Sequence, residues 1–221
     1  MKLSILMPAH NEVQTVAEIV ERVLTVQLNQ EIVIIDDGSS DGTSEVIDKL
    51  ASSSVKVIHH ATNKGKGAAI RTGLEAATGD VIVIQDADLE YDPYDLLRLI
   101  EPIRENRANV VYGVRSLASQ KWIMRMGNKF VTRVTNLLYS QRLKDMETCY
   151  KMMKRELALS LDLECNGFEI EAEVTAKLLR AGEKIYELPI SYTARKENKK
   201  LSPVHGLPTV RALWKYHKWK S

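Results

Sequence analysis

The sequence predicts an α/β fold with a Rossmann-like, mostly parallel central sheet flanked by helices. Two patterns support this expectation. Short apolar runs alternate with segments of helical periodicity through the first half of the chain, as in strand–helix units stacked on a parallel sheet. Turn residues, chiefly Asp, Gly, Asn and Pro, separate these segments. With 221 residues, of which 44% are hydrophobic and 27% charged, the chain has the length and composition of a single globular domain.

Five strands and four helices are expected in the first half. The strands are the apolar runs at 3–8, 31–36, 55–60, 80–85 and 109–114. The helices lie between them, near 12–26, 42–51, 66–77 and 93–105. Ligands of open parallel sheets bind beyond the carboxyl ends of the strands, so the residues that follow each strand are the candidates for a functional site.

The pattern changes in the second half. We expect a long helix near 121–140, a mixed segment over 145–156, a helix near 169–181 and a strand over 184–192. No Gly/Ser-rich or Pro-rich linker separates the halves, so 1–221 is expected to form one domain in which 116–192 is a C-terminal lobe added to 1–115. Residues 193–221 are expected to form a mobile charged loop, centred on 194–203, and then a basic amphipathic helix.

Composition excludes several classes of protein. A net charge of +2 is too small to indicate a nucleic-acid-binding protein. No window approaches 18 consecutive apolar residues, so no membrane-spanning helix is expected. The start of the chain resembles a first strand more than a targeting segment, and two cysteines, Cys149 and Cys165, then indicate reduced thiols of a cytosolic protein.

Carboxylates follow two of the predicted strands. Asp36 ends the run 31–36 and Asp37 follows it, and Asp86 and Asp88 follow the run 80–85 with only Ala87 between them. In an extended backbone, residues two apart share one face, so Asp86 and Asp88 would repel unless a cation lay between them. Oxygen ligands suit Mg²⁺ or Mn²⁺. The alternative for the first pair is a strand-to-helix turn punctuated by Asp and Gly.

Other phosphate-binding designs are absent or ambiguous. The sequence has no G-x-x-x-x-G-K-[ST] motif, and no G-x-G-x-x-G follows the first strand. The segment "NKGKGAAIRTG" (63–73) places Gly65 and Gly67 beside Lys64, Lys66 and Arg71, where amide groups and cations could meet an anion. A Gly-rich turn before an Ala-rich helix is the alternative.

Five ordered motifs resemble those of family 2 glycosyltransferases with the GT-A fold. They are "MPAHNE", "IVIIDDGSSDGT", "NKGKGAAIRTGLEAATGD", "QDADLEYDP" and "YGVR", followed by "GFEIEAEVTAKLLRAGEKIYELPISY". The resemblance extends to about residue 215 and is strongest to the polyprenyl (dolichyl or undecaprenyl) phosphate branch. The chain departs from that branch at Cys149-Tyr150-Lys151, where the family pattern has Gly-Phe-Arg, and this leaves the acceptor open.

The resemblance implies a set of site residues. Asp86, Asp88 and Glu90 would bind Mg²⁺ or Mn²⁺, and Asp36 would order its loop. Asp88, Arg115 and Asp145 would be catalytic. The nucleotide sugar would contact Pro8, Ala9, His10, Glu12, Ile35, Asp37, Lys66, Gln85, Asp86, Ala87, Asp88, Arg115 and Arg125.

The implied reaction is an inverting transfer of a hexose from a GDP- or UDP-linked sugar. A lipid phosphate acceptor is already ionised near neutral pH and needs no general base. A sugar hydroxyl acceptor would need one, and Asp145, Glu147 and Glu169 are the candidates. Acids at 169, 171 and 173 also suit the start of a helix for its dipole alone. A nucleotidyltransferase and an inactive binding protein of the same fold are the alternatives from other classes.

The last segment, 205–221, favours the lipid acceptor. It carries Trp214 and Trp219 among four cations, and a basic amphipathic helix with tryptophan can lie on a membrane surface; the cations are Arg211, Lys215, Lys218 and Lys220. A terminal helix packed on the domain is the alternative. The expected partners are therefore a nucleotide sugar, a lipid phosphate, the cytoplasmic face of a membrane and, as helpers, membrane-embedded subunits, with no nucleic acid.

Overall fold

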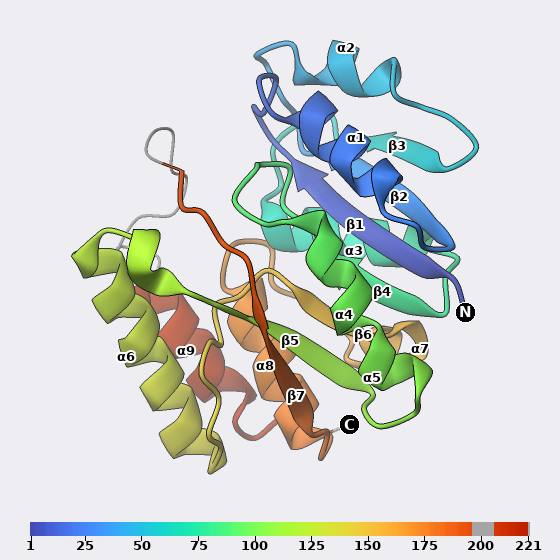
Figure 1. The fold of residues 1–221 in the computed structure, drawn as a ribbon. Helices are drawn as coiled ribbons and strands as arrows, with labels where there is room; N and C mark the ends of the chain where they lie inside the picture. The colour runs from blue at the N-terminus through green and yellow to red at the C-terminus, as the bar shows by residue number, and fades with distance from the viewer. Residues whose placement is uncertain (196–205, 221) are drawn as a thin grey trace.

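A single mixed sheet of seven strands runs through the molecule, with helices on both faces (Figure 1). The computed structural model describes residues 1–195 and 206–220. The strand order is β3-β2-β1-β4-β6-β5-β7. The strands are β1 (Leu3–Ala9), β2 (Gln30–Asp36), β3 (Val55–His59), β4 (Val81–Ile84), β5 (Val110–Arg115), β6 (Lys151–Lys154) and β7 (Ile185–Ile190).

The register of the parallel strands brings their carboxyl ends to one edge. β1 pairs with β2 so that Ala9 lies opposite Asp36, and Asp36 lies opposite His59 of β3. β1 also pairs with β4, with Leu6 opposite Ile84, so the residues after Ile84 emerge at the same edge. The mostly parallel sheet predicted from the sequence is confirmed. β6 is the exception, since it runs antiparallel to both β4 and β5.

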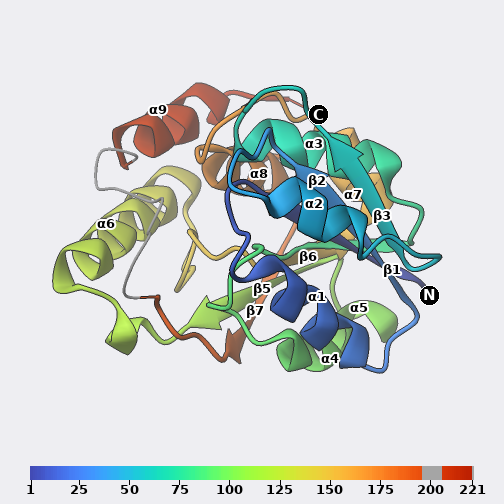
Figure 2. The ribbon, with the colours of Figure 1, turned by 90° about the horizontal axis from the view of Figure 1, so that it is seen from above.

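Helices cover both faces of the sheet. In the view from above, α1, α4 and α5 lie on one face and α3, α7 and α8 on the other (Figure 2). Two 3₁₀ turns, η1 (Pro93–Asp95) and η2 (Leu117–Ser119), join strands to helices. The α-helices are α1 (Val16–Thr25), α2 (Thr43–Asp48), α3 (Lys66–Ala76), α4 (Leu96–Leu99), α5 (Glu101–Arg104), α6 (Trp122–Tyr139), α7 (Arg155–Ser160), α8 (Ile170–Arg180) and α9 (Gly206–Tyr216).

The structure differs from the expected elements in two places. The helix expected over 93–105 is divided into η1, α4 and α5, and prolines stand at the starts of η1 and α5, where a missing N–H is tolerated. The mixed segment 145–156 contains the short strand β6 and the start of α7. Four residues of "KMMK" carry too little periodicity to identify a strand, yet Met152 and Met153 are buried in the core.

The C-terminal helix α9 packs against α6 and α8 (Figure 1). Trp219 is partly buried, with Lys177 over its ring, and Lys215 pairs with Glu164 at 3.0 Å. The inner face of α9 therefore packs on the domain, as in the alternative considered for this segment. On its outer face, Leu207 and Trp214 are exposed. The inner cluster consists of Val131, Met146, Ala172, Ala176, Ala212, Leu213 and Tyr216.

Of the charged loop expected at 194–203, residues 196–203 lie outside the described part of the chain. Across residues 1–195 and 206–220, none of the helices combines the length and apolar character that crossing a bilayer requires.

Candidate active site

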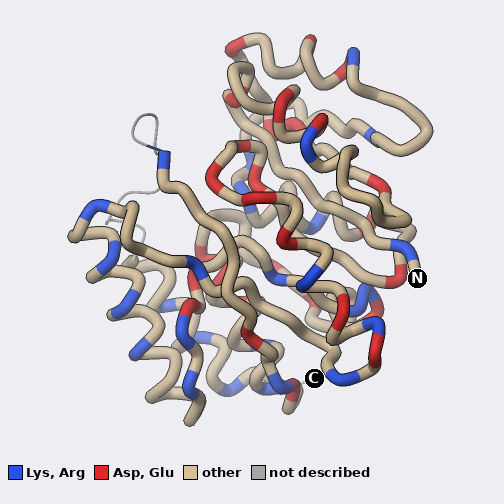
Figure 3. The backbone as a smooth tube through the Cα atoms, in the orientation of Figure 1, with Lys and Arg blue, Asp and Glu red and all other residues tan. Residues whose placement is uncertain are grey.

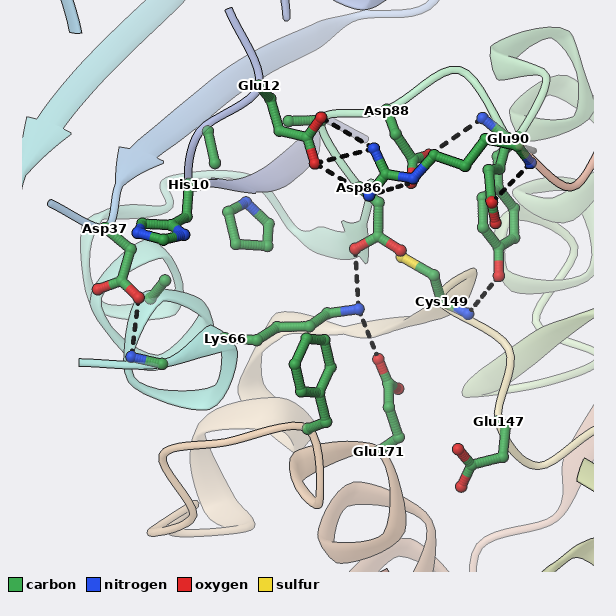
Figure 4. Close-up of a pocket in the computed structure, with 18 of the residues that line it drawn as sticks. His10, Glu12, Asp37, Lys66, Asp86, Asp88, Glu90, Glu147, Cys149 and Glu171 are labelled. Carbon is green, nitrogen blue, oxygen red and sulfur yellow. Dashed lines mark hydrogen bonds and ion pairs between the residues drawn. The ribbon is translucent and has the colours of Figure 1, made fainter. Parts of the chain in front are cut away.

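A cavity of about 330 Å³ opens at the carboxyl edge of the sheet (Figure 4). Its walls come from the ends of β1, β2, β4 and β5, the starts of α3 and α8, and the segment after β7. The structure thus brings together most of the site residues expected from the sequence. Those that line the cavity are Pro8, Ala9, His10, Glu12, Asp37, Lys66, Asp86, Ala87, Asp88, Glu90 and Arg115.

The Asp86 and Asp88 carboxylates experience opposite electrostatic environments. Burial acts to raise the pKa of Asp86, but the Lys66 ammonium, 2.8 Å from Oδ1, outweighs it and the pKa is lowered. Asp88 is buried near the negative charges of Asp86 and Glu90, and its pKa is raised to about 7. A second cation near Asp88 would relieve this repulsion.

Lys66 is held by a row of alternating charges that reaches into the second half of the chain. Its Nζ lies 2.8 Å from Asp86 and 3.0 Å from Oε1 of Glu171 on α8. The other oxygen of Glu171 lies 2.5 Å from Nζ of Lys151 on β6. Lys151 is fully buried and also donates to the carbonyl oxygens of Met146 and Thr148. Glu171 therefore fixes Lys66 facing the cavity (Figure 4).

Arg195 closes the opposite side of the acid pair. Its guanidinium lies 3.0 Å from Oε2 of Glu12 and 3.8 Å from Oδ2 of Asp88. The backbone leading to it is fixed on Glu90, whose carboxylate accepts from the Arg195 N–H at 2.8 Å and from the Tyr192 hydroxyl at 2.6 Å. Lys66 and Arg195 therefore place one cation on each side of Asp86 and Asp88.

The acid pair suits a hard divalent cation. In the described part of the chain, no group of three or more His, Cys, Asp and Glu side chains is arranged to hold a metal ion, and the Glu90 carboxylate is engaged with Tyr192 and Arg195. Mg²⁺ and Mn²⁺ are commonly held by one or two carboxylates, with phosphate oxygens and waters completing the shell. Asp86 and Asp88 fit that role, and Glu90 fits a supporting one.

Arg115 and Asp145 form a bidentate pair beside the cavity. Nε and Nη2 of Arg115 donate to the two carboxylate oxygens at 2.7 and 2.8 Å, and Asn128 Nδ2 donates to Oδ1 at 3.0 Å. Burial acts to raise the pKa of Asp145, but Arg115 and these hydrogen bonds lower it. A carboxylate so stabilised in its charged form is a poor general base. Asp145 instead positions Arg115, which lines the cavity.

The two aspartates after β2 have different environments. Asp36 accepts from the Ser39 N–H at 3.0 Å and from the Ser44 hydroxyl at 2.5 Å, in agreement with the loop-ordering role expected for it. Asp37 lines the cavity, and its two oxygens also accept from the N–H groups of Lys64 and Gly65 at 2.9 and 2.8 Å. Asp37 therefore holds the loop that leads to Lys66.

The Gly-rich start of α3 has mainly a packing role. The N–H groups of Gly67 and Ala68 both donate to the carbonyl oxygen of Asn166, so these amides do not face an anion. A Cβ on Gly65 would lie 2.4 Å from that oxygen, and one on Gly67 would lie 2.3 Å from another backbone carbonyl oxygen. Glycine is required because the two segments meet here, and Lys66 is the side chain that the turn delivers to the cavity.

Three residues expected in the nucleotide-sugar site lie outside the cavity lining. Ile35 is fully buried in the core, and Arg125 is exposed on α6. Gln85 is also fully buried, where it accepts from the Tyr150 hydroxyl at 2.6 Å and donates to the backbone of Asp86 at 3.0 Å. Gln85 thus holds the backbone of Asp86 from the buried side of the site.

The candidate general bases are separated by the structure. Glu169 lies at the start of α8 and accepts from the Gly167 N–H at 3.2 Å, as expected of an acid placed there for the helix terminus alone. Glu147 lines the cavity, and its Oε1 has no hydrogen-bond partner among the described residues. Burial, with Glu171 nearby, raises the pKa of Glu147 to about 7.

Several lining residues were not predicted. Arg195 lies within the charged segment 194–203 and has no motif around it, so only its contacts with Glu12 and Asp88 identify it. Cys149 was noted only as a departure from the family pattern; its thiol is buried, with a pKa raised well above the usual value, and is therefore protonated. The others are Asn63, Ala69, Tyr91, Gln120, Met124, Phe168, Glu171 and Tyr192.

The mostly parallel sheet and the aspartate pair facing a cavity at its carboxyl edge define a GT-A-like α/β enzyme fold. The sequence model of "Glycosyl transferase family 2" matches residues 4–160. The chain therefore belongs to glycosyl transferase family 2, the family expected from its motifs.

Relatives and solved structures agree with this family and fold. The chain is 30% identical to a dolichol-phosphate mannosyltransferase of Pyrococcus furiosus over all of this chain and 65% of that protein, so it spans less than two thirds of this relative. It is 28% identical to an undecaprenyl-phosphate mannosyltransferase of Micrococcus luteus over 88% of this chain and 85% of the relative. Glucosyl-3-phosphoglycerate synthase of Mycobacterium tuberculosis, solved with Mn²⁺, UDP and phosphoglyceric acid, superposes with a TM-score of 0.78 at 20% identity, over 100% and 80% of the two chains.

Proposed function

We propose that this chain transfers a hexosyl group, with inversion and in the presence of Mg²⁺ or Mn²⁺, from a GDP- or UDP-linked sugar to a polyprenyl phosphate. The observation that carries the proposal is the meeting of the Asp86–Asp88 pair with Lys66, Arg115 and Arg195 in one cavity. Carboxylates that can hold a cation, flanked by three basic side chains, suit a diphosphate ligand that leaves with negative charge.

The donor side of the cavity supplies the charge stabilisation. Asp86 and Asp88 would hold the metal ion, which when bound neutralises negative charge developing on the diphosphate. Lys66 is already held beside Asp86, and Arg115, fixed by Asp145 through Nε and Nη2, can direct Nη1 at a phosphate oxygen. The Mn²⁺ and UDP held by the M. tuberculosis neighbour support a metal-dependent nucleotide-sugar donor for this chain as well.

The acceptor is inferred from the relatives, whose names give dolichol phosphate and undecaprenyl phosphate. A phosphate acceptor is an anionic nucleophile at neutral pH, so no general base is needed. The cytoplasmic face of a membrane is then where enzyme and acceptor meet, with or without membrane-embedded subunits.

A sugar hydroxyl is the second candidate acceptor, because Glu147 lines the cavity and has the properties of a general base. Its pKa is raised to about 7, and its Oε1 has no hydrogen-bond partner among the described residues. A base whose pKa lies near the working pH is well suited to remove a hydroxyl proton.

The test is a donor and acceptor panel. GDP- and UDP-linked hexoses would be offered with a short polyprenyl phosphate or with soluble sugars, with Mn²⁺ and after chelation. We expect metal-dependent product on polyprenyl phosphate and none from the Asp88→Asn variant at equal folded concentration. Transfer to soluble sugars alone would replace the lipid acceptor with the second candidate, and transfer unaffected by chelation would remove the metal.

A further inference from the structure

The outer face of α6 presents several large apolar side chains to solvent on one side of the helix. Five residues, defined here as the α6 stripe, are Trp122, Ile123, Met126, Phe130 and Leu137, with 71%, 47%, 55%, 59% and 84% of their surface exposed. At about 100° per residue, all five fall within an arc of about 100° around the helix. Scattered exposed apolar residues are ordinary, whereas a contiguous row marks an interaction surface.

The stripe is not the core-facing side of the helix. The opposite side of α6 buries Asn128, Val131, Thr132 and Thr135 against the rest of the lobe. A helix of a globular protein normally turns its apolar side toward the core, whereas three of the four buried residues of α6 are polar. The apolar side that α6 exposes is therefore available to a partner.

Charge identifies the kind of partner. Exposed basic residues recur at every fourth position of the helix and its approach, at Lys121, Arg125, Lys129 and Arg133, in a row that nears the stripe from one side and enters it at Arg133. Residues 116–144 contain no acidic residue at all. Figure 3 shows this row of basic positions along α6 without acidic ones between them. An apolar row bordered by cations matches a surface of anionic lipid, in which acyl chains lie beneath negative headgroups.

The position of α6 relative to the cavity gives this surface a use. Gln120 precedes the first two stripe residues in the sequence and Met124 follows them, and both line the cavity. We infer that the α6 stripe lies on an anionic lipid surface and holds the cavity mouth at the headgroup level. This inference deepens the proposed function, because it places the cavity where a lipid-borne phosphate would present itself. It also moves the expected main attachment from α9 to α6.

The experiment compares matched variants in vesicle co-sedimentation. The probes are phosphatidylcholine vesicles with and without phosphatidylglycerol, at low and high salt. The stripe variant is Trp122→Gln, Met126→Gln and Phe130→Gln, in which glutamine preserves helix propensity. Its control, Leu24→Gln, Tyr94→Gln and Leu159→Gln, changes side chains that are 46%, 57% and 42% exposed on other elements.

Two further variants separate the contributions of charge and of α9. Lys121→Gln, Lys129→Gln and Arg133→Gln remove cations beside the stripe, and Leu207→Gln with Trp214→Gln changes the outer face of α9. We expect the stripe variant to lose about tenfold or more in vesicle affinity and the control to retain wild-type affinity. The charge variant should lose the preference for phosphatidylglycerol. Brominated lipid should quench the tryptophan fluorescence of wild type, and this quenching should be smaller in Trp122→Phe. The measurement tests the stripe with a single substitution.

Several outcomes would overturn the inference. The inference fails if wild-type protein binds neither kind of vesicle, or if the stripe variant binds vesicles as well as wild type does. It also fails if wild type is a dimer and the stripe variant is a monomer, because the stripe would then be an interface between copies. Transfer assays with detergent-dispersed polyprenyl phosphate run in parallel. Vesicle binding without transfer contradicts the proposed function and leaves the stripe in place, whereas transfer without stripe-dependent binding contradicts the stripe alone.

Discussion

Replacing Glu147 with glutamine should stabilise the protein at high pH and leave its stability unchanged at low pH. Glu147 lines the cavity, and Oε1 has no hydrogen-bond partner among the described residues. Burial raises its pKa from an ordinary value of 4.5 to about 7. The folded protein therefore binds one more proton than the unfolded chain between these two pH values, and its stability falls as the pH rises through this window.

The magnitude follows from the width of the window. Each pH unit contributes about 1.4 kcal/mol to the free energy of unfolding, so the ionised Glu147 side chain costs at most about 3 to 4 kcal/mol well above pH 7. The cost is absent below about pH 4.5, where the side chain is neutral in both states. Glutamine has a similar shape and no charge, so the variant should match wild type near the acid end and exceed it increasingly toward pH 8.

Urea denaturation at a series of pH values between 5 and 8 measures this difference directly. Glu75→Gln, at an exposed position, is the matched control and should follow wild type throughout. A constant difference between Glu147→Gln and wild type across the series would refute the electrostatic reasoning. The same variant distinguishes the acceptors, because transfer to a phosphate should survive the substitution and transfer to a sugar hydroxyl should not.

The other predictions concern the acid pair, its neighbours and the α3 turn. Asp88→Asn should lower metal-dependent turnover, measured over a Mn²⁺ titration, by on the order of 10²-fold or more without lowering the melting temperature, and Glu90→Gln should show a smaller defect. Near wild-type turnover of Asp88→Asn at saturating Mn²⁺ would reject the metal role. Arg195→Gln should tighten Mn²⁺ binding several-fold in the absence of nucleotide, by electron paramagnetic resonance, because it removes a competing cation 3.8 Å from Asp88; unchanged or weaker binding would contradict this. Gly67→Ala should destabilise the fold by about 2 kcal/mol or more, because its Cβ would lie 2.3 Å from a backbone carbonyl oxygen. Gly127→Ala on α6, where a Cβ meets nothing within 4 Å, should instead stabilise the fold by about 1 kcal/mol. The same urea titrations measure both variants.

Much of the first half of the fold could be predicted because each element carries a complete local signal. β1, β2 and β4 are apolar runs bounded by turn residues, and α3 begins at a Gly-rich turn. β6 could not be predicted, because its assignment depends on two neighbouring strands far away in the sequence. Its buried Lys151 even argues against a core strand until Glu171 and the two carbonyl oxygens that accept from it are known.

The residues of the candidate site likewise fall into two groups, those that a local sequence pattern predicts and those that depend on contacts distant in the sequence. Asp86, Asp88 and Asp37 follow strands directly, so the edge they share follows from the parallel order alone. Arg195 depends instead on the path of the chain after β7, which returns to Glu90 through hydrogen bonds that no local pattern encodes. The surroundings of Asp145 are another example, since its sequence neighbours do not indicate that Arg115 and Asn128 contact it.

Lys66 shows why a motif alone is insufficient to define this site. The segment 63–73 offered two interpretations, and the backbone amides of α3 follow the packing interpretation because Asn166 accepts from them. The Lys66 side chain nevertheless faces the cavity, because Glu171 holds its Nζ at 3.0 Å from the far side. Glu171 is in turn fixed by Lys151, a fully buried ammonium that cannot forgo an anionic partner without a large desolvation cost. The core of the second half thus determines the direction of a basic side chain from the first, and the cavity is complete only when both halves have folded.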